Sequence, residues 1–336
     1  MNVTLYHTDR MLYYNKVTAA FQSRIQPPRA AWCRAFLAAF PAFVLLLSPG
    51  PASAALRVAV TIKPVYSLVA SVMDGVGQPD LLIGGGESPH THAVRPSEAR
   101  AMSRADIIFW IGPSLEVSFI KPIAALGRGR AVALIDVPGI AILPVRPADP
   151  VGETGQPVPA STGPDPHIWM DPENARVMVR SIAQALSAAD PAHANRYAAN
   201  AAATDQQLAG LEAQIAERVA PVRGVSFIVF HDALQYFERR FGLASLGAVT
   251  LSPDRAPGAK RIRELHQLAA SGQVRCIFTE PQFEPAIVRT IISGTKVKSG
   301  TLDDIGAELP AGPDLYSEVL WHLAENLRRC LLPPPG

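Results

Sequence analysis

The chain has 336 residues, of which 48% are hydrophobic and 18% are charged, and this composition suits a globular protein of one or two domains. Its formal net charge is +2, but the first 54 residues hold five basic residues and one acid, which leaves 26 basic and 28 acidic residues in the remainder, a net charge of −2. Such a remainder has no basic field to attract nucleic acid or anionic lipid, so neither is expected as a partner.

The N-terminus has the pattern of a secretory signal peptide. Basic residues precede an apolar run at 35–47, and an A-x-A cleavage site follows at 52–54, so residues 1–54 are predicted to be removed on export. A membrane anchor is the alternative, but the run is short for a bilayer and Pro41 interrupts it.

Two cysteines, Cys276 and Cys330, remain after this leader. An even number of cysteines in an oxidising compartment predicts a disulfide, which would tie the C-terminal helix to a central strand. Two buried free thiols are the alternative.

Strand and helix patterns alternate along the rest of the chain. Apolar, β-branched runs predict strands at 56–62, 81–83, 107–111, 131–135, 226–230, 243–249, 274–279 and 295–299. Helical patterns lie between them, and a last helix is predicted over 316–331. This alternation is typical of the α/β class, with mostly parallel sheets flanked by helices.

Two segments interrupt the alternation. Residues 144–166 are rich in Pro, Gly and small polar residues and predict a flexible surface loop. Residues 173–219 are compatible with helix, and the part after the break at Asp190-Pro191 is about 40 Å long at 1.5 Å per residue, enough to run past a domain. The predicted domains are an N-terminal lobe at 55–190, a long linking helix at 191–220 and a C-terminal lobe at 221–336.

Three histidines follow predicted strands or the loop: His90 in GESPHTH, His167 in DPHIW and His231 after SFIVF. Ligands of open α/β sheets bind at the carboxyl ends of strands, so the three side chains can converge if the lobes face each other. Three imidazoles with a carboxylate or water suit a first-row metal, most naturally tetrahedral zinc. Asp303 in GTLDDIG is the expected acid, with Asp304 in reserve. Histidines that only satisfy core hydrogen bonds are the alternative.

Three neighbouring residues receive lesser roles. His92 is expected to be a solvated loop residue, with contact to the metal as the alternative. Asp232 is expected to cap the following helix or to orient a neighbour. Glu280, which also ends a predicted strand, is expected near the site without binding metal.

Several longer segments carry a family resemblance. They are ESPHTHAVRPSEARAMSRADIIFWIGPSLE, DPHIWMDPENA, FIVFHDALQYFERRFGL, PGAKRIREL, CIFTEPQF and GTLDDIGAELPAGPDLYSEVL. Together they resemble the periplasmic zinc-binding components of bacterial zinc-uptake ABC transporters, which belong to the metal-specific solute-binding proteins. The resemblance covers nearly all of residues 56–332.

The resemblance implies a monomeric periplasmic protein, not an enzyme, that captures Zn²⁺ as its transported ligand and delivers it to the membrane permease of an ABC importer. It implies two lobes joined by a long helix. It also implies that His90, His167 and His231 bind the metal and that Asp303 lies at or near the fourth position. Some zinc-binding members carry a disulfide at positions matching Cys276 and Cys330.

The chain departs from its relatives in two places. Many zinc-specific relatives carry a His- and acid-rich insertion in the loop matching 144–166, whereas this loop has no His, so an auxiliary zinc-collecting role is not expected. At His92, relatives more often have Tyr.

Two other functions remain as alternatives. A manganese- or iron-binding member of the same family would favour more oxygen ligands, which His231 argues against. A secreted zinc hydrolase would need an open coordination position and a general base. The chain has no H-E-x-x-H and no G-x-S-x-G motif.

Overall fold

The structure is a computed structural model that describes residues 55–126, 131–146, 163–250, 256–283 and 286–333. The predicted signal peptide and the middle of the predicted loop lie outside the described residues. No helix in the described residues combines the length and apolarity that crossing a membrane requires.

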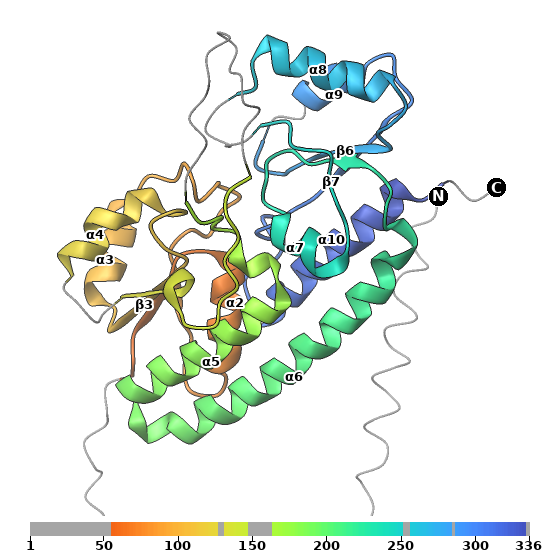
Figure 1. Ribbon diagram of the computed structural model, residues 1–336. Helices are drawn as coiled ribbons and strands as arrows, with labels where there is room; N and C mark the ends of the chain where they lie inside the picture. The colour runs from red at the N-terminus through yellow and green to blue at the C-terminus, as the bar shows by residue number, and fades with distance from the viewer. Residues whose placement is uncertain (1–54, 127–130, 147–162, 251–255, 284–285, 334–336) are drawn as a thin grey trace, which may run out of the picture. The chain divides into compact units, whose positions relative to one another are not determined.

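The first sheet has four parallel strands in the order β2-β1-β3-β4 (Figure 1). Their bounds are Val58–Val60 (β1), Asp80–Leu81 (β2), Ile107–Trp110 (β3) and Ala131–Ala133 (β4). Helices α2 (Lys63–Val72), α3 (Pro96–Arg104) and α4 (Ile120–Ala125) connect successive strands. The central strands β1 and β3 are buried along their whole length, which explains their unbroken apolar sequences.

The second sheet is also parallel and has the order β5-β6-β7. Its strands span Phe227–Ile228 (β5), Cys276–Thr279 (β6) and Lys298–Thr301 (β7), and its helices span Gln235–Phe241 (α7), Ala259–Ala270 (α8) and Ala286–Ile292 (α9). The strand predicted at 243–249 is reduced to a single bridge between Val229 and Ala248. Gly247 has φ of 137°, a conformation that interrupts an extended strand.

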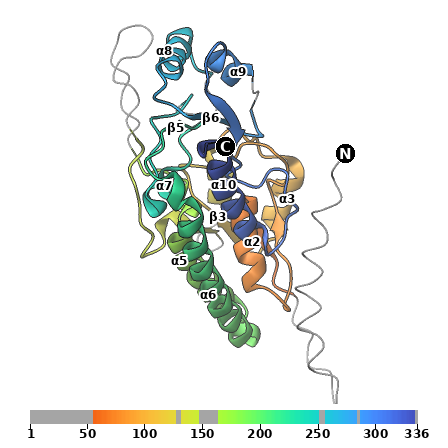
Figure 2. The same cartoon turned by 90° about the vertical axis from the view of Figure 1, so that its right-hand side faces the viewer.

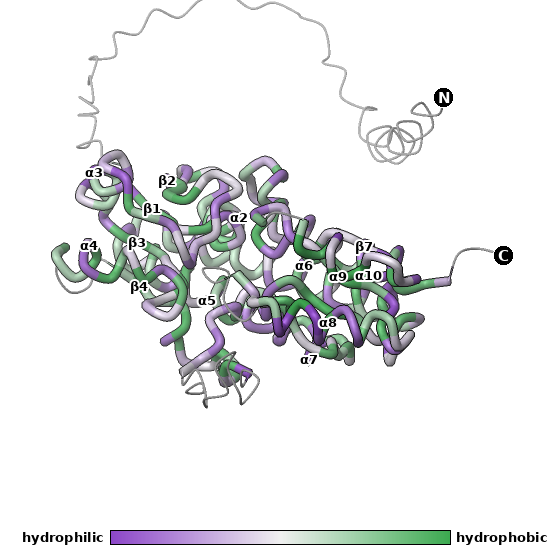
Figure 3. The backbone as a smooth tube through the Cα atoms, turned by 90° about the horizontal axis from the view of Figure 1, so that it is seen from above, coloured by the Kyte–Doolittle hydropathy of each residue, from purple (hydrophilic) through white to green (hydrophobic). Residues whose placement is uncertain are grey.

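Three long helices hold the two sheets together. They are α5 (Pro172–Ala189), α6 (Ala194–Val219, 26 residues) and α10 (Leu315–Leu331). The first two pack along each other, and α10 packs on α6 and α2 (Figures 1 and 2). Each of these helices buries one face: in α6 the buried residues recur every three or four positions from Tyr197 to Val219. Hydrophobic and hydrophilic segments are interspersed throughout the described chain (Figure 3).

One continuous core includes residues of both sheets together with α2, α5, α6 and α10. A smaller cluster lies on the other face of the second sheet, under α8 and α9. The strands alternate between the two cores: Phe227, Cys276 and Phe278 face the large core, whereas Ile228 and Ile277 face the small one. This period of two is the geometry of a strand covered on both faces.

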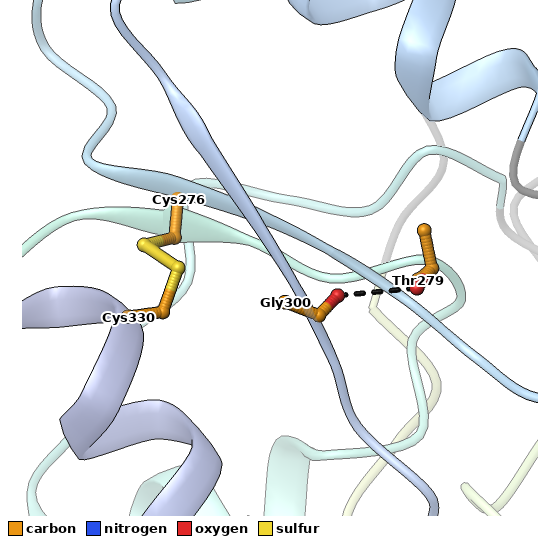
Figure 4. Close-up of a disulfide and its surroundings, with 4 residues drawn as sticks. All are labelled: Cys276, Thr279, Gly300 and Cys330. Atoms are coloured by element: carbon orange, nitrogen blue, oxygen red, sulfur yellow. Dashed lines mark hydrogen bonds between the residues drawn. A yellow bond between two sulfur atoms is a disulfide. The ribbon is translucent and has the colours of Figure 1, made fainter. Parts of the chain in front are cut away.

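The predicted disulfide is confirmed. Cys276 of β6 and Cys330 of α10 are bonded, with their Cα atoms 6.2 Å apart (Figure 4). Gly300 of β7 lies beside this bridge, where a Cβ atom would come within 2.8 Å of the Phe278 ring, so only glycine fits. The last helix is therefore fixed to the strand that leads directly to Glu280.

Candidate metal centre

The structure brings together the three histidines singled out from the sequence. His90 lies in the loop between β2 and α3, His167 precedes the turn Ile168–Met170, and His231 follows β5. One nitrogen of each lies within 4.8 Å of the others. The Nε2 atom of His167 is 3.1 Å from Nε2 of His90 and 3.3 Å from Nε2 of His231. The three lone-pair positions thus converge on one point between the two sheets.

Two of the three histidines are buried. His167 and His231 are each only 4% exposed, whereas His90 is partly exposed. The Trp169 ring lies 5.3 Å from the ring of His167, and the Phe283 ring lies 6.1 Å from that of His231. Burial strengthens charge interactions within the cluster.

Two carboxylates support two of the three histidines. Oδ1 of Asp165 accepts hydrogen bonds from the backbone N–H of His167 (3.0 Å) and from its Nδ1–H (2.7 Å). Oε1 of Glu280 accepts the same two bonds from His231, at 3.1 and 2.7 Å. With the proton held on Nδ1, Nε2 is left as the metal-facing atom.

Asp165 was not singled out from the sequence as a site residue, although it stands two residues before His167 in DPHIW. Glu280 lies beside the site, as expected.

Burial and neighbouring charges shift the pKa values of His90 and His231 in opposite directions. Burial, followed by repulsion from the other two imidazoles, lowers the pKa of His90 to about 2. Burial acts the same way on His231, but the charge and hydrogen bond of Glu280 outweigh it and raise the pKa of His231 to about 9. In the metal-free state the cluster therefore holds a proton on His231 at neutral pH.

The acids of the GTLDDIG segment occupy different positions. Oδ1 of Asp303 accepts the backbone N–H groups of Ile305 (3.3 Å) and Gly306 (2.9 Å), and the structure does not bring Asp303 into the group of converging ligand atoms. Asp304 is buried, and its carboxyl group interacts electrostatically with His231 and His167. Burial first of all raises the pKa of Asp304 to about 6.

The expectation for His92 is wrong. Its side chain is buried, and its two ring nitrogens lie 2.8 Å from carboxylate oxygens of Glu87 and Glu98. The ring stacks on Phe119 at 5.8 Å. The loop folds back on α3 at this point, so His92 fastens the segment that carries His90 and is not part of the cluster.

Asp232 does not cap the next helix, because α7 begins at Gln235 with Leu234 as its N-cap. Instead Oδ1 of Asp232 lies 3.4 Å from a guanidinium nitrogen of Arg146, the last described residue before the interior of the loop. This ion pair is not a hydrogen bond, since the buried Oδ1 of Asp232 has no hydrogen-bond partner among the described residues.

The fold and the converging histidines define a class of metal-binding proteins built on two linked α/β lobes. The solved structure of the periplasmic zinc binding protein TroA from Treponema pallidum shares this fold with a TM-score of 0.70, covering 83% of this chain and 100% of that one at 22% identity. A likeness at this identity concerns the fold alone.

The chain belongs to the ZnuA family, described as zinc-uptake complex component A, periplasmic, which it matches over residues 58–330. It is 40% identical over 304 residues to the high-affinity zinc uptake system protein ZnuA of Brucella abortus (strain 2308), with 82% of this chain and 91% of that protein covered. It is 32% identical over 304 residues to the protein of the same name from Yersinia pestis, with 86% and 96% covered. The resemblance and the fold class inferred from the sequence are thus confirmed.

Proposed function

We propose that this protein captures Zn²⁺ in the periplasm and delivers it to the membrane permease of an ABC importer. The observation that carries the proposal is the convergence of three imidazole Nε2 atoms, two of them buried and supported by carboxylates. Zinc binds imidazole nitrogen at about 2.0–2.1 Å in tetrahedral sites, which places the ligand nitrogens roughly 3.3 Å apart. The separations of 3.1 and 3.3 Å between the Nε2 atoms here are close to that value. Membership of the ZnuA family supports the import role.

The proposed ligands are His90, His167 and His231. Asp303 remains the proposed fourth ligand, with Asp304 or a water molecule as the alternative. Coordination by Asp303 would compete with its backbone hydrogen bonds, whereas Asp304 already faces the histidines electrostatically. Titration of Asp303→Asn and Asp304→Asn with zinc distinguishes them, because only the ligand variant loses affinity.

Zinc is favoured over manganese or iron by the donor set. The three converging atoms are nitrogens, and the softer imidazole suits zinc, whereas Mn²⁺ prefers a site richer in oxygen. The test is metal analysis of protein purified without chelator, followed by competitive calorimetry of the stripped protein with Zn²⁺, Mn²⁺ and Fe²⁺. Tighter binding of Mn²⁺ than of Zn²⁺ would reject the assignment.

A zinc hydrolase is the alternative from a different class. A cavity of about 610 Å³ is lined by Glu280 and Asp303 but by none of the three histidines. Because the chain belongs to a zinc-uptake family, we propose that the protein is not an enzyme. An esterase and peptidase screen of the zinc-loaded protein tests this, and no turnover is expected.

The proposal includes removal of residues 1–54 and a monomer built from lobes at 55–190 and 221–336 with a linking helix at 191–220. The mass of the protein recovered from a periplasmic fraction tests the cleavage. Size-exclusion chromatography with light scattering tests the monomer. Limited proteolysis tests the lobe boundaries.

A further inference from the structure

Asp165 and Glu280 make matching contacts from opposite sides of the cluster. Each carboxylate oxygen accepts both the backbone N–H and the Nδ1–H of one histidine. The hydrogen bond from the histidine's backbone N–H fixes the position of the carboxylate. The second hydrogen bond, from the ring Nδ1–H, then sets the direction in which the imidazole points. Among the described residues, His90 has no carboxylate within hydrogen-bond distance of its ring.

Both carboxylates are themselves held in place. Gln235 of α7 donates its side-chain N–H to Oδ2 of Asp165 at 2.8 Å, and the Tyr236 hydroxyl donates to the backbone oxygen of Asp165 at 2.8 Å. Glu280 directly follows β6, and its Oε1 is held by the backbone N–H of His231 at 3.1 Å. A carboxylate that is fixed in this way sets the tautomer of its histidine and raises its strength as a ligand.

His90 lies in a different kind of environment. His90 is partly exposed as a residue, and it lies in an irregular loop between β2 and α3. The loop is held in place by His92, whose ring nitrogens contact the carboxylates of Glu87 and Glu98, and not by His90. The imidazole of His90 is therefore the least constrained of the three.

We propose that Asp165 and Glu280 are positioning residues that preassemble a half-site from His167 and His231, and that His90 binds the ion last and closes the site. The inference rests on the proposed function. It assigns to two carboxylates a role in zinc affinity without contact with the ion. It also assigns to His90 the step that controls retention of the ion.

The amide variants Asp165→Asn and Glu280→Gln test the first half. Each amide oxygen can still accept the two hydrogen bonds, so the fold is kept while the charge is lost. We expect zinc affinity to fall about 10- to 100-fold in each, and the visible d–d bands of the Co²⁺-substituted protein to shift because the imidazole becomes a weaker ligand. The midpoint of thermal unfolding of these variants without metal should change no more than that of the control variant, Asp190→Asn.

Asp190→Asn is the matched control. Oδ2 of Asp190 lies 2.7 Å from Nδ1 of His193, the same contact at the same distance on an exposed histidine outside the cluster. This variant should leave zinc affinity and the Co²⁺ spectrum unchanged. A lower thermal midpoint with unaltered Co²⁺ bands in Asp165→Asn and Glu280→Gln would identify a purely structural role and overturn the inference.

Rapid mixing tests the second half. His90→Ala should associate with zinc at nearly the wild-type rate but release it much faster, whereas His231→Ala should fail to form the initial complex. Equal slowing of association in both variants would overturn the proposed order. If both amide variants bind zinc as tightly as the wild-type protein, the positioning role is rejected while the proposed function stands. If the wild-type protein itself binds no zinc, the proposed function and this inference are rejected together.

Discussion

The indole N–H of Trp169 donates a 2.8 Å hydrogen bond to the backbone oxygen of Asp304. Trp169 stands two residues after His167, and its own backbone oxygen accepts the hydroxyl of Tyr316 on α10 at 2.7 Å. The segment after β7 and the segment that carries His167 are thereby joined, although Trp169 and Asp304 are 135 positions apart in the sequence. The geometry of the metal centre thus depends on bonds between distant parts of the chain.

Replacing any one of the three clustered histidines with alanine should weaken zinc binding by more than the roughly 100-fold that loss of an outer partner causes, because a direct donor is lost. Competition with a chromogenic chelator measures the effect. His266→Ala and His322→Ala are the controls: His266 lies 2.9 Å from the Ile291 carbonyl oxygen, and His322 is exposed on α10. Unchanged affinity in His231→Ala would reject the site.

Zinc binding should release about one proton per ion at pH 7.5, because a metal-ligating histidine must give up the proton on its coordinating nitrogen. The pKa of His231 is raised to about 9 in the metal-free protein, so the proton is bound below this pH and competes with zinc. Apparent affinity should accordingly rise as the pH increases from 7 toward 9 and level off above. Calorimetry in buffers of different ionisation enthalpy counts the protons, and an affinity that is flat across this range would contradict the prediction.

Two deletions in the loop should have opposite results. Residues 148–161 contain no histidine, and the chain on either side is already paired by the bridge between Pro144 and Pro164. Deleting 148–161 should leave zinc affinity intact. Deleting all of 144–166 also removes Asp165, the support of His167, and should weaken binding. Equal affinities of the two variants in a zinc titration would show that Asp165 has no role.

Lys63 should be a strong determinant of stability. Its buried ammonium donates to the backbone oxygens of Gly306 (3.0 Å), Ala307 (2.8 Å) and Leu309 (3.0 Å). Lys63→Met leaves these acceptors without their donor, and we expect the free energy of unfolding to fall by about 3 kcal/mol. The exposed Lys121 on α4 is the control, and Lys121→Met should change stability by less than about 0.5 kcal/mol. Urea unfolding measures the stability of both variants. Similar unfolding midpoints would show that the hydrogen bonds of Lys63 do not stabilise the fold.

Removing the disulfide should cost stability but not zinc affinity. The bridge joins cysteines 54 positions apart, and the chain-entropy relation gives about 4 kcal/mol for a loop of this size. The Cys276→Ala/Cys330→Ala variant should unfold at lower denaturant, as should reduced wild-type protein. Neither cysteine belongs to the cluster, so folded protein should bind zinc with its usual affinity. A large affinity loss in folded protein would show that the bridge positions Glu280.

The sequence predicts which histidines meet mainly through the family resemblance, because the three lie 77 and 64 positions apart and their strand-end positions alone allow convergence without requiring it. It is not sufficient to place adjacent side chains. Asp303 and Asp304 are neighbours, and only the folded turn decides that the first accepts backbone amides while the second faces the histidines. Asp165 and His92 escaped the prediction for the same reason, since a partner's direction depends on how a loop folds back.

The continuous hydrophobic core limits how far the two sheets can move apart when zinc is released. Strands of both sheets and helices α2, α6 and α10 share one hydrophobic cluster, so swinging the sheets apart would expose apolar surface at about 25 cal/mol per Å². Exposing about 400 Å² would require roughly 10 kcal/mol, comparable to the whole stability of a domain. We therefore expect the two sheets to stay together when zinc is released, so that only residues beside the cluster move. X-ray scattering curves of the empty and loaded protein should superimpose.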